Sequence, residues 1–288
     1  MKSVAITGAS QGLGARAAIE FAQKGYQVLG TVFSESELTN LQEQSEFPDL
    51  HYFTCDVTQQ DQVDNWAAFV AQTVKGKGID ILINNAGVLT PGPIEILPFT
   101  EITYEFEVNV FGSLRVINSF LPMLRQAQGR ILQIGSVSGI LPVPYNGVSS
   151  ASKATMEAFA DVFRTELRPF SVDFVMVAPG NMLTAGPAKT IRRIDKLTED
   201  MTSEQRALYG KEFGSFSKVF TQMQSTGIPV KAAAERLIEI AEKNPAPIRA
   251  GIGEDAEEMR ELVKVKTDEE LDAMRSEMFG LTKTKENT

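Results

Sequence analysis

The stretch "SVAITGASQGLGARAAIEFA", residues 3–22, decides the fold of this chain. It opens with a short apolar run, passes through Gly8, Gly12 and Gly14, and continues with helical character. Glycines between a strand and a helix let the backbone approach a pyrophosphate, whose charge is stabilised by N–H groups and the positive end of the helix dipole. A glycine trio alone is also compatible with an ordinary turn, but its position between a strand and a helix favours a dinucleotide site.

The rest of the chain alternates short β-branched runs with longer segments of helical period, which is the pattern of a parallel sheet covered by helices. We therefore predict an α/β fold with a doubly wound, mostly parallel sheet of the Rossmann type, formed as a single domain. The expected strands are residues 3–7, 26–32, 50–55, 79–84, 129–136, 172–179 and 246–253.

Two of the intervening helices can be described from the sequence. After "CDVT", Val63, Trp66 and Val70 recur at helical spacing behind an expected N-cap at Thr58, so Trp66 is expected in the core. Residues 150–168 form a second long helix, whose alanines permit close packing against a neighbouring helix.

The regular alternation ends after residue 184. Residues 185–230 are predicted to be a helical insertion rather than sheet, and residues 254–288 a charged helical extension that frays at "KTKENT", 283–288. The main domain is thus expected to span residues 1–253. The insertion either closes over a hydrophobic substrate or simply packs on the sheet, and its apolar residues are Met201, Leu208, Tyr209, Phe213, Phe216, Phe220 and Met223.

Composition excludes several classes of function. The formal net charge of −9 repels nucleic acid and anionic membranes. One cysteine, Cys55, and one histidine, His51, exclude a disulfide framework, a His-rich metal site and a triad that needs a second His, so no metal is expected and Cys55 is expected to be buried at a strand end. No signal-peptide pattern precedes the first strand and no apolar run approaches about 18 residues, so we expect a cytoplasmic protein without stable membrane insertion.

Several ordered motifs over residues 1–184 resemble those of the short-chain dehydrogenase/reductase family. They are "TGASQGLG", "CDVT", "NNAG", "NVFG", "IGSVSG", "SASKA" and "PGNMLT". The resemblance implies an oxidoreductase that transfers hydride between a nicotinamide cofactor, NAD or NADP, and a carbonyl or alcohol carbon. The cofactor-binding residues that it implies are Gly8, Ser10, Gln11, Gly12, Leu13, Gly14, Phe33, Asp56, Val57, Asn85, Ala86, Gly87, Lys153, Pro179, Gly180 and Thr184.

The same resemblance implies four catalytic positions, Asn109, Ser136, Ser149 and Lys153. Lys153 would hold the nicotinamide ribose, Ser136 would hydrogen-bond the substrate oxygen, and Asn109 would fix a proton-relaying water. Each residue also has a purely structural interpretation, as a cap, a loop residue or a solvated lysine. Their occurrence together at the family's spacing favours the catalytic one.

Position 149 departs from the family pattern, which places a Tyr four residues before the lysine. A Ser hydroxyl lies several ångströms short of the substrate oxygen and is a much poorer acid than a phenol of pKa about 10. Three interpretations follow. The chain is an oxidoreductase scaffold whose proton donor has been replaced, by design or naturally, or it is an enzyme with another proton source such as water. The third interpretation is a catalytically silent dinucleotide-binding sensor or partner-binding protein. Tyr145 is expected to line the substrate entrance rather than to substitute as donor.

Cofactor type, substrate and assembly are marked less clearly. No acidic residue stands at Val32 and no Arg at Phe33 or Gln11, which slightly favours NADP over NAD, with Thr31, Ser34 and Ser36 as possible hydroxyl donors to its phosphate. The segment "PIRAGIGEDAEEM" resembles the hydroxysteroid and retinol dehydrogenase branch, which implies a hydrophobic carbonyl or alcohol substrate. In the family the helix that carries the lysine pairs with its copy in a second subunit, so we expect a homodimer, or else a homotetramer.

Overall fold

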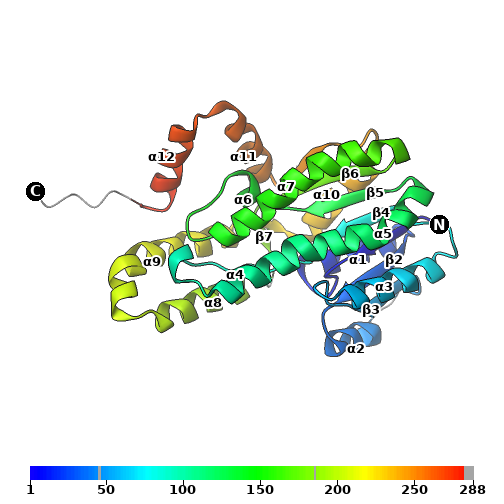
Figure 1. Cartoon of the computed structure of the whole chain (residues 1–288), viewed down its shortest axis with the longest axis horizontal. Helices are drawn as coiled ribbons and strands as arrows, with labels where there is room; N and C mark the ends of the chain where they lie inside the picture. The colour runs from blue at the N-terminus through cyan, green and yellow to red at the C-terminus, as the bar shows by residue number, and fades with distance from the viewer. Residues whose placement is uncertain (45–46, 185, 282–288) are drawn as a thin grey trace, which may run out of the picture.

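The computed structural model describes residues 1–44, 47–184 and 186–281. Its centre is a sheet of seven parallel strands in the order β3-β2-β1-β4-β5-β6-β9 (Figure 1). From β1 the chain winds outward to β3, then crosses back to β4 and winds the other way, which confirms the doubly wound fold. The strands are β1 (Ser3–Ile6), β2 (Gln27–Val32), β3 (Leu50–Thr54), β4 (Ile81–Asn84), β5 (Arg130–Ile134), β6 (Asp173–Pro179) and β9 (Arg249–Ile252).

Helices cover both faces of this sheet, so its central strands are buried along their whole length and mostly apolar. On one face Trp66 is fully buried, as expected, and its ring centroid lies 4.5 Å from that of Phe120. The helices on this face are α3 (Gln60–Thr73), α5 (Ser113–Ala127) and α7 (Gly147–Leu167), and those on the other are α1 (Gly12–Gln23) and α10 (Val230–Glu242). None of the helices within the described ranges is long and apolar enough to cross a lipid bilayer.

The turn between β3 and α3 corrects one detail of the sequence analysis. Gln59, not Thr58, is the N-cap of α3, and no side-chain cap bond is formed there within the described structure. Instead, Asp56 Oδ1 accepts a hydrogen bond from the Thr58 amide at 2.9 Å. Cys55 is buried beside this turn, as expected, and burial raises the pKa of its thiol to about 12, which makes it unreactive.

The insertion and the extension lie beyond the sheet (Figure 1). The insertion contains α8 (Gly186–Asp200) and α9 (Ser203–Ser225), but it also contributes β8 (Ile228–Pro229), which pairs with β7 (Met182–Leu183) where only helix was expected. The extension forms α11 (Glu254–Val265) and α12 (Asp268–Met278). Its predicted frayed end, residues 283–288, lies outside the described residues.

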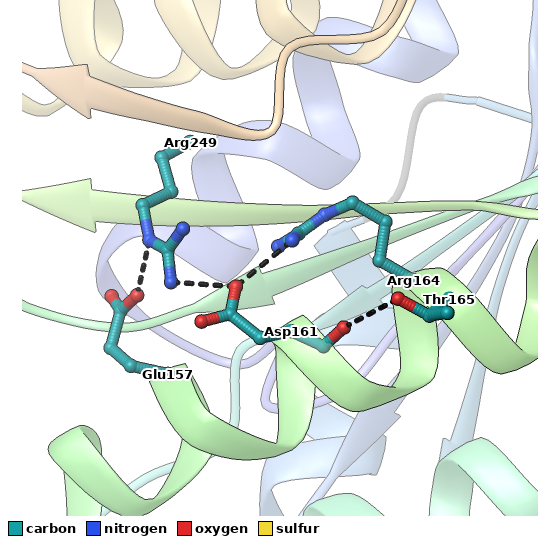
Figure 2. Close-up of polar contacts among 5 residues, drawn as sticks. All are labelled: Glu157, Asp161, Arg164, Thr165 and Arg249. Carbon is teal, nitrogen blue, oxygen red and sulfur yellow. Dashed lines mark hydrogen bonds and ion pairs between the residues drawn. The ribbon is translucent and has the colours of Figure 1, made fainter.

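Ion pairs connect α7 to the edge strand β9 (Figure 2). Arg249 donates from Nε to Glu157 and from Nη2 to Asp161, each at 2.8 Å, and Arg164 donates to Asp161 at 2.9 Å. Hydrogen bonds from Arg249 and Arg164 lower the pKa of Asp161. These contacts hold α7, which carries Ser149 and Lys153, in register with the sheet.

Smaller helices lie between the main elements of the fold. The segment between β4 and α5 runs through α4 into a π-helical stretch. The bounds of these elements are α2 (Glu35–Gln44), α4 (Phe99–Phe106), the π-helical stretch Glu107–Gly112, α6 (Val137–Ile140) and two 3₁₀ turns, Ile94–Ile96 and Arg168–Phe170.

Candidate active site

The glycine turn between β1 and α1 has the geometry that its sequence predicted. Gly8 and Gly12 adopt positive φ angles of 68° and 58°, which suit glycine. A Cβ on Gly14 would lie 2.2 Å from the Gly8 carbonyl oxygen, so only glycine fits there. Gln11 caps α1 without a side-chain hydrogen bond in the described structure, which leaves the first-turn amides directed toward an incoming anion. The turn therefore fits the diphosphate of a dinucleotide.

Hydrogen bonds fix this turn to the end of β4. Asn85 donates from Nδ2 to the Thr7 and Gly8 carbonyls at 3.0 and 3.1 Å. Thr7 Oγ1 accepts from the amides of Asn85 and Ala86 at 2.9 and 3.0 Å. The β1 and β4 ends form the point where the winding of the sheet reverses, the position at which open α/β sheets bind ligands.

A cavity of about 400 Å³ runs along this edge of the sheet. Sequence reasoning missed two of its charged residues, Glu37 and Lys189. Glu37 accepts from the Phe33 amide at 3.0 Å, and Lys189 donates to Gln11 Oε1 at 2.8 Å. Lys189 belongs to the insertion, whose approach to the glycine turn has no signal in the sequence. The predicted cofactor residues that line this cavity are Gly8, Ser10, Gln11, Leu13, Phe33, Asp56, Val57, Asn85, Ala86 and Gly87.

A neighbouring cavity of about 570 Å³ brings together Ser136, Ser149 and Lys153. The predicted cofactor residues Pro179 and Gly180 also line it. The insertion and the extension contribute part of its apolar lining. The apolar side chains there include Phe220, Met223 and Phe279.

The remaining predicted residues lie around these two cavities. Gly12 and Thr184 line a third cavity of about 550 Å³, Gly14 is packed inside the turn, and Asn109 is buried behind the cavity wall. Tyr145 is not among the described residues that line the 570 Å³ cavity, contrary to our expectation. Its ring instead packs against Phe213 and Phe216, at centroid distances of 5.5 and 5.7 Å.

The apolar residues of the insertion fall into two groups, one packed together and one lining the cavity. Phe213 and Phe216 are fully buried in a small core of their own, whereas Phe220 and Met223 face the cavity.

Lys153 lines the 570 Å³ cavity together with two other cationic side chains, Lys189 and Arg193. Its Nζ donates to the Ile134 carbonyl at 3.0 Å. Burial lowers the pKa of Lys153 to about 8, while the carboxylate of Glu105 acts in the opposite direction. A Cβ on Gly87 would stand 3.5 Å from this ammonium group, so the glycine keeps the space beside it open.

Asn109 lies in the π-helical stretch, a type of local distortion frequent at functional sites. Its amide spans the backbone of Val88, with Nδ2 donating to the carbonyl at 3.0 Å and Oδ1 accepting from the amide at 2.9 Å. Nδ2 also donates to Ser152 Oγ at 3.0 Å. Asn109 thus joins α7 to the loop after β4.

Both cavity serines are held in place. Ser136 caps α6, because its Oγ accepts from the Ser138 amide at 3.1 Å, and it lines the cavity at the same time. Ser149 is only 5% exposed and begins the buried face of α7. The capping role considered for Ser136 is therefore real and compatible with a role in the site.

Glu105 is the buried group that sequence reasoning did not identify. In "EITYEFEVNV" it resembles its acidic neighbours, but its exposure is 0%. Burial raises the pKa of its carboxyl, and hydrogen bonding and the charge of Lys153 offset this only in part.

The reversal point of the sheet, the glycine turn and the lysine cavity together define a dinucleotide-binding α/β enzyme. A sequence model described as short chain dehydrogenase matches residues 2–194. The chain belongs to the short-chain dehydrogenase family and is an NAD(P)-dependent oxidoreductase that acts on a small molecule, as the motifs implied.

Relatives and solved structures agree with this assignment. The NADPH-dependent 3-dehydrocapnine reductase of Ornithobacterium rhinotracheale is 32% identical over 247 residues, which cover 83% of each chain. Human retinol dehydrogenase 16 is 32% identical over 227 residues, 77% of this chain and 71% of the relative. A short chain dehydrogenase from Burkholderia cenocepacia, crystallised in complex with NADP, has the same fold, with a TM-score of 0.73 at 23% identity over 98% of this chain and 100% of that one.

Proposed function

We propose that this chain is built to transfer hydride between NADP and a carbonyl or alcohol group of a hydrophobic small molecule, and that Ser149 occupies the position of the family's proton-donating Tyr. The observation that carries the proposal is the 570 Å³ cavity. It is lined by Ser136, Ser149 and Lys153 together with apolar side chains. Binding, orientation and hydride transfer are provided for, whereas the usual proton donor is not.

The residues of the cavity have separate roles in this proposal. A bound nicotinamide dinucleotide supplies or accepts the hydride. Lys153, held by the Ile134 carbonyl, binds the nicotinamide ribose and provides positive charge next to the reacting oxygen. Ser136 donates a hydrogen bond to that oxygen. The family's Tyr would reach it too, but a Ser side chain is shorter by the whole ring.

Two observations support NADP over NAD. The 3-dehydrocapnine reductase that the chain resembles is NADPH-dependent by name. Lys189 also places a cation at the mouth of the dinucleotide cavity, next to Gln11. Glu37, which lines this cavity together with Asp56, is already engaged by the Phe33 amide.

Restoring the phenol tests the proposal. We expect Ser149→Tyr to oxidise NADPH with aldehydes, ketones or steroids at least about 10²-fold faster than the parent chain, because a lost general acid is worth about 10²- to 10⁴-fold in rate. The measurement is steady-state absorbance of NADPH over a broad carbonyl panel, with Ser149→Phe, which has the ring without the hydroxyl, as the matched control. Absence of any gain across the panel would instead favour a silent dinucleotide-binding protein.

A further inference from the structure

Glu105 is a fully buried carboxyl group next to the cavity, and one of its oxygens has no hydrogen bond of ordinary geometry among the described residues. Oε1 accepts from Asn109 Nδ2 at 3.2 Å and from Ser152 Oγ at 3.5 Å. Oε2 is buried and makes no hydrogen bond of ordinary geometry with any residue that the structure describes. A buried carboxyl with an unused oxygen is costly, and such groups concentrate at functional sites.

This carboxyl faces the position from which the Tyr is missing. Ser149 and Ser152 lie three residues apart on one face of α7, and Ser152 Oγ joins the Ser149 carbonyl, at 3.0 Å, to Glu105. The hydroxyl and backbone amide of Thr90, and then the hydroxyl of Ser149, also lie close enough to the carboxyl to lower its pKa by hydrogen bonding, although none of these contacts has ordinary geometry. Ser149 lines the cavity on its other side. It therefore stands between Glu105 and the substrate space.

We propose that Glu105 is the proton reservoir of this chain and delivers its proton to the substrate oxygen through the Ser149 hydroxyl, with a solvent molecule spanning the remaining distance. The inference rests on the proposed carbonyl reduction in this cavity. As hydride from NADPH bonds to the carbonyl carbon, the electron pair of the C=O π bond takes up a proton at oxygen. Ser149 is reprotonated by Glu105, which becomes a carboxylate and regains its proton from solvent after the alcohol leaves.

The charge environment suits this direction of transfer. Burial raises the pKa of Glu105 and favours its protonated form, whereas Lys153, the charged group of α7 that acts on it, stabilises the carboxylate once the proton has left. The other groups around the carboxyl, Asn109, Ser152 and Thr90, are neutral. Because only the protonated acid can donate, the rate of reduction should fall as pH rises through this pKa. By acting through Ser149, Glu105 is a positioning and relay residue rather than one that touches substrate.

The test is a single-turnover measurement of NADPH oxidation in the full-length chain, with the carbonyl compound that Ser149→Tyr reduces fastest. We expect Glu105→Gln to slow the parent chain by at least about 10-fold and up to about 10²-fold. In the Ser149→Tyr background the same substitution should change the rate by less than about threefold, because the phenol then supplies the proton. Glu107→Gln is the matched control, since Glu107 lies two residues away, is partly exposed and pairs with Arg115.

The pH dependence distinguishes a relay from a structural role. The parent rate should decline with rising pH, and Glu105→Gln should remove that decline while NADPH affinity stays unchanged. The relay would be overturned if Glu105→Gln slowed both backgrounds equally, or if it did not slow the parent chain. It would also be overturned if the parent rate did not fall with rising pH. A parent chain without turnover also overturns the relay. In that case an active Ser149→Tyr variant still supports the proposed function, whereas an inactive Ser149→Tyr variant refutes both the relay and the proposed function. If Glu105→Gln does not fold, a parent rate that does not fall with rising pH still overturns the relay.

Discussion

Gly14 tests the dinucleotide site at the scale of a single residue. A Cβ at this position would come within 2.2 Å of the Gly8 carbonyl and 2.5 Å of Asn85 Nδ2. We expect Gly14→Ala to displace the turn, to cost about 1–3 kcal/mol of stability through overpacking, and to weaken NADPH binding by at least about 10-fold, or roughly 1.4 kcal/mol. Calorimetric titration and thermal unfolding measure the two effects.

A glycine elsewhere provides the control for this substitution. Gly214 lies within α9, and an added Cβ would meet no atom within 4 Å. Gly214→Ala should therefore stabilise the helix by about 1 kcal/mol and leave NADPH affinity unchanged. If Gly14→Ala bound NADPH as tightly as Gly214→Ala does, the diphosphate would not depend on this turn.

For single residues of the site, the sequence predicted those whose chemistry follows from local spacing. Gly8, Ser136 and Lys153 lie in short motifs attached to strand ends or to one helix, so a parallel sheet brings them to one edge. Glu105 and Lys189 could not be found in this way. Their significance depends on burial and on contacts across the fold, and the adjacent residues give each of them the appearance of an ordinary surface charge.

Among the elements, α12 positions one apolar side chain of the 570 Å³ cavity. Phe279, which directly follows α12, is 2% exposed, and its ring centroid lies 5.6 Å from that of Phe216 in α9. Arg275 anchors the same helix by donating to the Pro142 carbonyl at 3.0 Å. The C-terminal extension is thus part of the site rather than a detached tail.

We expect Phe279→Ala to raise the KM for a hydrophobic substrate by about 10-fold, because a truncated buried Phe loses about 3–5 kcal/mol of packing and only part of that loss is felt at the cavity. The turnover number should change little, since the proton and hydride positions are untouched. The comparison is made by steady-state kinetics in the Ser149→Tyr background. Phe99→Ala removes a ring that is 76% exposed and should leave KM unchanged; a similar KM for both variants would separate α12 from substrate binding.

The elements also show where periodicity is a reliable guide. All seven strands lie where short apolar runs predicted them, because a buried parallel strand has an almost continuous apolar sequence. The two-residue strands β7 and β8 escaped notice, since so short a pairing has no period. The N-cap of α3 was displaced by one residue because Asp56, rather than Thr58, forms the side-chain bond in that turn.

For the whole molecule we propose a homodimer built on α7. Phe159 and Val162 on this helix are 37% and 54% exposed, although both are large and apolar. We expect Val162→Glu to shift the mass in light scattering toward the monomer, because it places a charge within the paired surface. Val265→Glu, at an 81% exposed site in α11, is the control. A parent chain that is monomeric at micromolar concentration would contradict the dimer.

We expect position 149 to determine the rate of reduction and to leave NADPH binding nearly unaffected. Single-turnover reduction measures the rate, and calorimetric titration measures the NADPH affinity. Both are carried out in parallel on the parent chain and on Ser149→Tyr. We expect the hydride-transfer rate of Ser149→Tyr to exceed that of the parent chain by at least about 10²-fold. The dissociation constant for NADPH should differ by less than about threefold, under about 1 kcal/mol. A change in NADPH affinity as large as the change in rate would place position 149 in the nucleotide site and contradict its assignment to the proton-donor position.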